Sequence, residues 1–115
     1  MSKKIICFGA SSENYATIIA DKYKNNISYC IDNDNSKHGL FSQVCGCQIY
    51  PIEKIKEEEK GTFYVIIVTT YYFNNMAAQL INMGLKRGED FDWAGDIIAI
   101  EKLKEYWDGK KAIKQ

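Results

Sequence analysis

The residues best placed to do chemistry are a glycine and an aspartate at the ends of two successive apolar segments. Gly9 follows the run IICF, and Asp32 follows ISYCI 23 residues later. In a Rossmann-type βαβ unit, a glycine after the first strand lets the backbone approach a phosphate, and an acid about 20 residues on binds a ribose hydroxyl. The spacing therefore predicts a nucleotide site formed where the two strands end.

The turn that begins at Gly9 matches a dinucleotide fingerprint only in part. That fingerprint would also have glycine at positions 11 and 14, where this chain has Ser11 and Asn14. A side chain at position 11 crowds a pyrophosphate, which disfavours NAD(P) as the ligand. The turn Gly9-Ala10-Ser11-Ser12 could instead hold a phosphate through its serine hydroxyls at the start of the following helix. The alternative is a plain strand-to-helix turn in which Ser12 caps the helix.

Polar residues also follow the second strand and the strongest apolar run of the chain. Asp32 and Asn33 could bind ribose or sugar hydroxyls, although Asx residues at this position also form turns on their own backbone. Thr69, Thr70, Tyr71 and Tyr72 follow FYVIIV and would supply a hydroxyl-rich, aromatic wall to a nucleoside or sugar pocket, with Thr69–Tyr71 expected to contact the ligand. Strand propensity followed by a turn explains the same residues without a ligand.

No catalytic or metal-binding pattern accompanies this predicted site. The sequence has no Ser-His-Asp, Walker, HExxH or CxxC signature, and its single histidine, His38, is expected to be solvated in a polar loop. Cys45 and Cys47 with one histidine fall short of a four-ligand zinc site. Cys7 and Cys30 lie within apolar strands, where a thiol behaves as a small hydrophobe. We expect all the cysteines to be reduced.

Hydrophobic periodicity predicts alternating strands and helices. The apolar stripe Phe73, Met76, Ala77, Leu80 and Ile81 predicts a helix that ends at Gly84. Asp32–Val44 is predicted to be a loop, and the last eight or so residues are expected to fray. The predicted strands are Lys4–Phe8, Ile27–Ile31, Cys47–Tyr50, Thr62–Thr70 and Phe91–Trp93, and the other predicted helices are Ser12–Lys24, Ile52–Glu58 and Ile97–Trp107. This order predicts a single three-layer, Rossmann-like α/β domain over residues 1–115, with a mostly parallel sheet of four or five strands and helices on both faces.

Composition excludes several classes of partner. The 15 basic residues balance the 15 acidic ones, whereas nucleic acids and anionic membranes call for a basic surplus. No apolar run approaches the ~20 residues of a membrane span, and MSKK is not followed by the apolar core of a signal peptide. We therefore expect a cytoplasmic protein that binds neither nucleic acid nor membrane.

Three segments resemble a known group of domains. They are IICFGASSENYATIIADKY, YCIDNDNSKHG with VCGCQIYPIEKI, and VIIVTTYYFNNMAAQLINMGLKRGEDF. Together they resemble the small Rossmann-like domains of bacterial cell-surface polysaccharide enzymes, such as the N-terminal domain of sugar acetyltransferases and modules that accompany methyltransferases and glycosyltransferases. The resemblance covers about Lys4–Trp93. It implies that Gly9, Ala10 and Ser11 lie beside a phosphate, that Asp32 is the acid after the second strand, and that the ligand is a nucleotide-sugar.

These observations lead to two expectations about function. The first is a nucleotide or nucleotide-sugar binding module without catalytic activity of its own, linked to cell-surface carbohydrate biosynthesis, because no acetyltransferase or methyltransferase module is appended. The alternative is an interaction domain with a degenerate site, which docks on a partner enzyme or on itself through exposed aromatic residues. The aromatic residues considered for that surface are Tyr50, Tyr71, Tyr72, Trp93, Tyr106 and Trp107.

Overall fold

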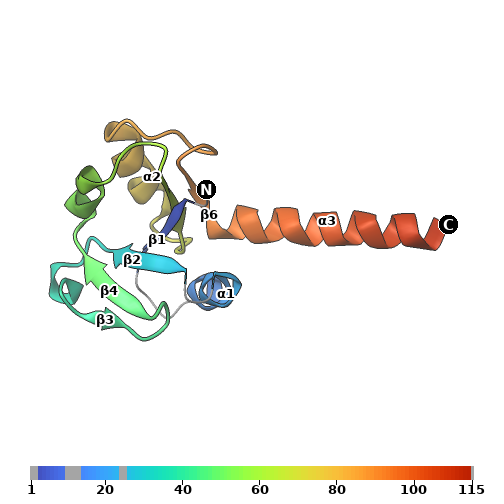
Figure 1. Cartoon of the computed structure of the whole chain (residues 1–115), viewed down its shortest axis with the longest axis horizontal. Helices are drawn as coiled ribbons and strands as arrows, with labels where there is room; N and C mark the ends of the chain where they lie inside the picture. The colour runs from blue at the N-terminus through green and yellow to red at the C-terminus, as the bar shows by residue number, and fades with distance from the viewer. Residues whose placement is uncertain (1–2, 10–13, 24–25, 115) are drawn as a thin grey trace.

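A six-stranded sheet runs through the middle of the molecule (Figure 1). The structure is a computed structural model, which describes residues 3–9, 14–23 and 26–114. The strands are β1 (Lys4–Phe8), β2 (Ile27–Ile31), β3 (Phe41–Ser42), β4 (Cys47–Tyr50), β5 (Phe63–Ile67) and β6 (Phe91–Trp93). The helices are α1 (Asn14–Lys22), η1 (Asn35–Lys37), η2 (Ile52–Glu57), α2 (Phe73–Asn82) and α3 (Ala94–Lys114).

The sheet is parallel except at one edge. Its order is β3-β4-β2-β1-β5-β6, and only β3 pairs antiparallel, through Phe41 with Gln48 and Ser42 with Cys47. β3 makes the sheet one strand larger than predicted, because it lies within Asp32–Val44, which was expected to be a loop throughout. The predicted α/β class and mostly parallel sheet are confirmed.

Alternate residues of the central strands enter two separate hydrophobic cores. On one face, residues such as Ile6, Phe8 and Val65 pack beneath α2 and η2. On the other, residues such as Cys7 and Ile66 pack against α1 and the start of α3. Because a parallel sheet buried on both faces needs apolar residues at every position, the continuous run FYVIIV belongs to a central strand. The predicted three-layer arrangement follows from these two cores.

Two helical segments differ from the prediction. η2 is a 3₁₀ helix rather than an α-helix, and its apolar residues Ile52 and Ile55 have the i, i+3 spacing that 3₁₀ geometry places on one side. α3 begins at Ala94 and continues to Lys114, so helical backbone includes most of the tail that was expected to fray. The predicted ends of the first helix, Ser12 and Lys24, lie outside the described residues.

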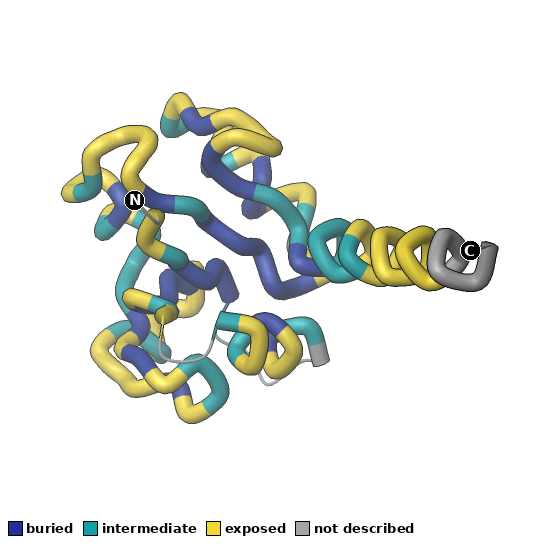
Figure 2. Tube along the Cα trace, turned by 45° about the vertical axis from the view of Figure 1, so that its right-hand side comes forward, coloured by how far each residue is buried: buried dark blue, intermediate teal, exposed yellow. Residues whose placement is uncertain are grey.

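α3 extends away from the rest of the domain (Figure 1). Its first turns contact α1, where Lys22 pairs with Glu101 and Ile97 and Ile98 are half-buried. Beyond them, residues from Ala99 are mostly exposed (Figure 2). Within the described part of the chain, no helix has both the length and the apolar character required to cross a bilayer.

Glu58 joins the end of η2 to the first two strands. Its Oε1 lies 3.0 Å from the Lys4 Nζ, and its Oε2 accepts a hydrogen bond of 2.9 Å from the Tyr29 hydroxyl. The Lys4 ammonium, followed by the Tyr29 hydroxyl, holds the pKa of Glu58 below its ordinary value. The Glu58 carboxylate is therefore more stable in the folded chain than in the unfolded one.

Substituting Glu58→Gln should remove a pH-dependent contribution to stability. Because the folded-state pKa is depressed, this contribution is complete above the unfolded value of about 4.3 and disappears as the pH falls through the folded value. The difference in urea midpoint between the natural chain and Glu58→Gln should thus be largest at neutral pH and shrink below about pH 4. Exposed Glu59→Gln controls for loss of one charge. A difference that grows with acidification would contradict the assignment.

Candidate functional site

The carboxyl ends of β2, β1 and β5 lie side by side and carry the polar residues predicted from the sequence. The Gly9 amide donates to the Ile31 carbonyl over 2.8 Å, and the Val68 amide donates to the Phe8 carbonyl over 3.1 Å. The Asp32 amide in turn donates to Tyr50 on β4 over 3.0 Å. The chain therefore leaves each strand at one edge of the sheet, which is where α/β proteins bind their ligands.

Gly9 is fixed by its backbone and by its neighbours. Its φ of 99° lies in the region that favours glycine, because side chains with a Cβ are strained there. An added Cβ would also lie 3.4 Å from Cγ2 of Val68 and 3.8 Å from both the Cε of Met76 and the Cγ2 of Thr69. Glycine at position 9 thus allows the backbone to turn and leaves space at the end of β1.

A cavity of about 430 Å³ opens at this edge of the sheet. Its walls come from the end of β1, the segment after β2, the end of β5 and the start of α2. The lining residues are Gly9, Asp32, Asn33, Asp34, Lys37, Thr69, Tyr72, Asn75 and Met76. The volume falls toward the lower end of the ~300–1,000 Å³ typical of small-molecule sites, so it suits a nucleoside- or sugar-sized group.

Asp32 places a buried carboxylate in the cavity wall. Only 8% of the residue is exposed. One oxygen, Oδ1, accepts a hydrogen bond of 2.8 Å from the Asp34 amide, and Oδ2 lies 3.9 Å from the Lys37 Nζ. Its backbone carbonyl accepts from the His38 Nε2 over 2.7 Å. These contacts hold the carboxylate in a fixed orientation, as recognition of a hydroxyl pair requires.

The segment after β2 is held over the cavity by polar contacts. Asn33 and Gln79 form a reciprocal amide pair, with distances of 2.7 Å and 3.1 Å, that connects this segment to α2. Asp34 caps η1 by accepting from the amide and hydroxyl of Ser36 over 3.0 Å and 2.7 Å, and these bonds lower the pKa of Asp34. The loop therefore has a defined shape despite its polar sequence.

Thr69 contributes a buried hydroxyl with an unused hydrogen-bonding capacity. The residue is 4% exposed and lines the cavity. Among the described residues, its Oγ1 and the Trp93 Nε1 are the buried side-chain atoms that lack a hydrogen-bond partner. A buried polar atom without a partner costs about 1–3 kcal/mol, so a donor or acceptor that reached Oγ1 would recover this free energy.

The structure brings together part of the predicted site. Gly9, Asp32, Asn33 and Thr69 line one cavity. Ala10, Ser11 and Ser12 lie outside the described residues. Thr70 and Tyr71 are not among the lining residues, and Tyr71 is 84% exposed. Of the two tyrosines in the predicted wall, Tyr72 is the one that lines the cavity, because α2 begins at Phe73 and its first turn faces the cavity with Asn75 and Met76.

Residues that sequence reasoning missed come from two elements. Asn75 and Met76 follow Tyr72 at i+3 and i+4 spacing, so the helical period could have identified them as part of the same face. Asp34 and Lys37 lie in η1 and its cap, a short 3₁₀ turn for which the sequence carries no periodic signal. His38 was expected to be solvated, but it is half-buried and donates to the Asp32 carbonyl.

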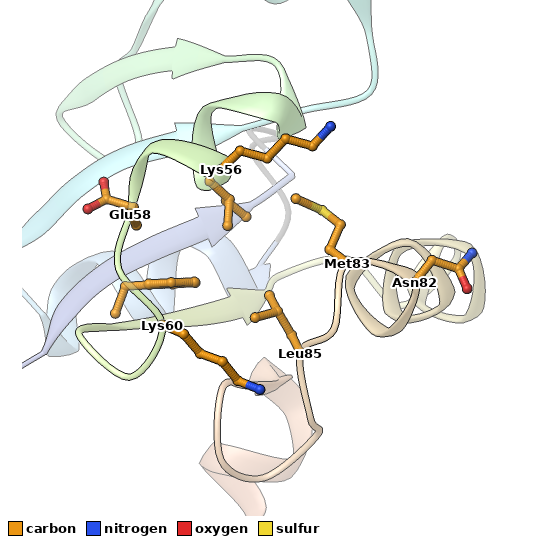
Figure 3. Close-up of a pocket in the computed structure, with 8 residues that line it drawn as sticks. Lys56, Glu58, Lys60, Asn82, Met83 and Leu85 are labelled. Atoms are coloured by element: carbon orange, nitrogen blue, oxygen red, sulfur yellow. The ribbon is translucent and has the colours of Figure 1, made fainter.

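A second hollow of about 320 Å³ lies at the opposite, amino-terminal end of β5 (Figure 3). Its floor is apolar, with Ile55, Phe63 and Leu85 buried beneath it. Figure 3 shows the polar ends of Lys56, Glu58 and Asn82 turned away from the hollow. Glu58 is bonded to Lys4 and Tyr29, and Lys60 donates to the Gly84 carbonyl over 3.1 Å. This hollow therefore offers no converging polar groups.

Across residues 3–9, 14–23 and 26–114, no group of three or more His, Cys, Asp or Glu side chains is arranged to hold a metal ion.

Comparison with known proteins adds no family assignment. No protein-family model matches the chain. No curated protein matches it closely enough to count as a relative.

Proposed function

We propose that this domain binds a nucleotide or nucleotide-sugar at the carboxyl edge of its sheet and has no catalytic activity of its own. The observation that carries the proposal is that two buried polar groups, the oriented Asp32 carboxylate and the Thr69 hydroxyl, line the same cavity. A carboxylate accepts hydrogen bonds from two vicinal hydroxyls, such as those of ribose or a hexose. The expected link with cell-surface carbohydrate synthesis rests on the resemblance described above.

The charges around the cavity support a neutral, hydroxyl-rich group in its interior. Asp32 and Asp34 lie on one side of the cavity. Lys37 is the positively charged residue among the described residues that line it. Two carboxylates would repel a phosphate placed between them, whereas Gly9 marks the side of the cavity where backbone can approach an anion. Tyr72 offers a ring face for stacking against a base or sugar.

A ligand panel tests this proposal with the purified chain. NAD, UDP-sugars, CDP compounds and S-adenosylmethionine should be screened by thermal shift, and any positive compound measured by calorimetry. Binding should raise the midpoint with increasing ligand concentration, because a ligand of the folded state stabilises it. No shift with any compound at millimolar concentration would overturn the proposal.

A second candidate function is self-association through α3. Ile100, Leu103, Tyr106 and Trp107, here called the α3 stripe, are 53–65% exposed. The positions 100, 103 and 107 have the spacing of an apolar helix face. A second copy could cover the stripe with its own, since a two-fold interface joins identical surfaces. Of the other aromatic residues considered, Tyr50 and Trp93 pack against the core instead.

Light scattering tests this second candidate. The chain should be a dimer that Leu103→Asp converts to a monomer, because a carboxylate at the interface would be desolvated. Leu40→Asp is the matched control, since Leu40 and Leu103 are 56% and 57% exposed. A monomeric natural chain, or dimers of both variants, would exclude the α3 stripe as the interface.

A further inference from the structure

All the cysteines of the chain gather on one face of the sheet. Cys7 and Cys30 are register partners on β1 and β2, and Cys47 lies on β4, the next strand. These three are buried in the same hydrophobic core, and Cys45 packs against it. The sequence separates these residues by up to 40 positions, but parallel pairing brings their side chains to one place.

One close contact in this thiol cluster is between Cys30 and Cys47. Their Sγ atoms are 3.4 Å apart, and both thiols are free. A disulfide has a sulfur–sulfur bond of about 2.05 Å, so these two sulfur atoms must move about 1.4 Å closer to form one. Together with the other residues that the structure describes, these thiols form no group arranged to hold a metal ion.

Cys45 is the member of the cluster that solvent reaches. It is half-buried, in a turn where its amide donates to the Ser42 hydroxyl over 3.1 Å and the Gly46 amide donates to the Ser42 carbonyl over 2.8 Å. Gly46 has a φ of 69°, which turns the chain sharply between the two cysteines of the C-x-C pair. The turn therefore holds Cys45 at the solvent-accessible side of the thiol cluster, whose other members are buried.

We propose that the thiol cluster is a peroxide-oxidisable site, in which Cys45 reacts first and a Cys30–Cys47 disulfide is the product. The inference is independent of the proposed ligand site. It rests on the gathering of the thiols, on the Cys30–Cys47 distance and on the access of solvent to Cys45.

The chemistry proceeds in three balanced steps. The Cys45 thiolate attacks hydrogen peroxide, the O–O bond breaks, and protonation gives Cys45 sulfenic acid and water; the sulfur is oxidised by two electrons. The Cys30 thiol then attacks the Cys45 sulfur, so that a disulfide forms and the oxygen leaves as a second water. Finally the Cys47 sulfur attacks Cys30, which forms the Cys30–Cys47 bond and releases Cys45 as a thiol that takes up the Cys47 proton.

The electrostatics of the thiol cluster support this order. Hydrogen bonds from the Cys30 and Cys7 thiols hold the pKa of Cys45 below its ordinary value, which favours the nucleophilic thiolate and makes Cys45 a good leaving group. The corresponding bond to Cys45 raises the pKa of Cys30, which disfavours direct reaction of Cys30 with peroxide. In the second step the Cys30 proton leaves with the sulfenic oxygen as water.

The expected disulfide would close the segment that lines the ligand cavity. Cys30 and Cys47 are 17 positions apart, and Asp32, Asp34 and Lys37 lie between them. Oxidation would therefore tie the two strands that carry this segment and restrict it in the unfolded chain. The oxidised protein should therefore unfold at a higher temperature than the reduced one.

The test is peroxide oxidation of the full, reduced chain under native conditions. The number of free thiols should fall from 4 to 2, and the intact mass should fall by two hydrogen atoms. The tryptic peptides 25–37 and 38–54 should be cross-linked, and fragmentation between Cys45 and Cys47, which share the second peptide, should place the bond on Cys47. Cys45→Ser should slow this cross-link by about tenfold or more, because the buried thiols are poorly accessible. Cys7→Ala should still form the Cys30–Cys47 bond, but no faster than the natural chain, because it removes one of the hydrogen bonds that lower the pKa of Cys45.

Three results would overturn the proposal. They are persistence of all the thiols in the folded chain, a cross-link that maps to another pair, and a Cys45→Ser variant that oxidises as fast as the natural protein. Circular dichroism before and after treatment verifies that each sample is folded. Because the peptide map of the natural chain identifies the bonded pair, the result does not depend on whether a buried variant folds.

Discussion

Substituting Phe8→Ala should lower the free energy of unfolding by about 3–5 kcal/mol. Phe8 is completely buried in the core between the sheet and α2. Removing its ring deletes apolar contacts and leaves a cavity that neighbouring strands cannot fill, since both faces of β1 are packed. Domains of this size are stable by only about 5–15 kcal/mol, so the loss would be a large fraction of the total. Urea unfolding followed by circular dichroism measures it.

Phe41→Ala is the matched control for this prediction. Phe41 lies on the edge strand β3 and is 58% exposed, so the same change should shift stability by roughly 1 kcal/mol or less. Equal shifts of the urea midpoint in the two variants would mean that β1 is not the centre of the core. A soluble but unfolded Phe8→Ala variant would agree with the larger value.

The central strands could be predicted because burial on both faces dictates their composition. β1, β2, β4 and β6 have the predicted bounds, and β5 lies within the predicted run. α2 ends at Asn82, with Gly84 in the left-handed region at a φ of 88°, as its sequence indicates. For each of these elements, the local sequence pattern agrees with the place that the element takes in the folded domain.

The short elements could not be predicted because tertiary pairing creates them. β3 has two residues, which extend only because Phe41 and Ser42 pair with β4. η1 depends on the Asp34 cap, and such a cap is equally common in turns. Neither element is long enough for a hydrophobic period to appear in the sequence.

The candidate site was predicted from strand ends and not from the loops around them. The spacing of Gly9 and Asp32 is a property of the βαβ unit, so it identified two residues that line one cavity. The choice between Tyr71 and Tyr72 depends on where α2 begins, which sequence patterns fix only to within a few residues. The thiol cluster was missed because Cys7 and Cys30 meet through strand register, which depends on pairing across the sheet.

Asp32→Asn should weaken binding of the ligand that the panel identifies by about 10- to 100-fold. A hydrogen bond to a charged group contributes about 1.5–3 kcal/mol, and each 1.4 kcal/mol changes affinity tenfold. The amide keeps the Oδ1 that accepts from the Asp34 amide, so the shape of the loop should survive. It loses the negative charge and replaces one acceptor with a donor, which opposes binding of a hydroxyl pair. Calorimetry of both proteins measures the ratio of dissociation constants.

Asp21→Asn makes the same chemical change at an exposed position of α1 and should leave the affinity unaltered. A folded Asp32→Asn variant that binds as tightly as the natural chain would show that the ligand lies elsewhere or does not use this carboxylate. A second substitution, Thr69→Val, separates these outcomes, because it removes a hydroxyl that is unpartnered within the described residues. If the ligand uses the cavity, Thr69→Val should weaken binding while leaving the unliganded protein at least as stable, since a buried atom without a partner is deleted. Thr69→Val would then have opposite effects on the free and bound states, which a purely structural role for Thr69 would not produce.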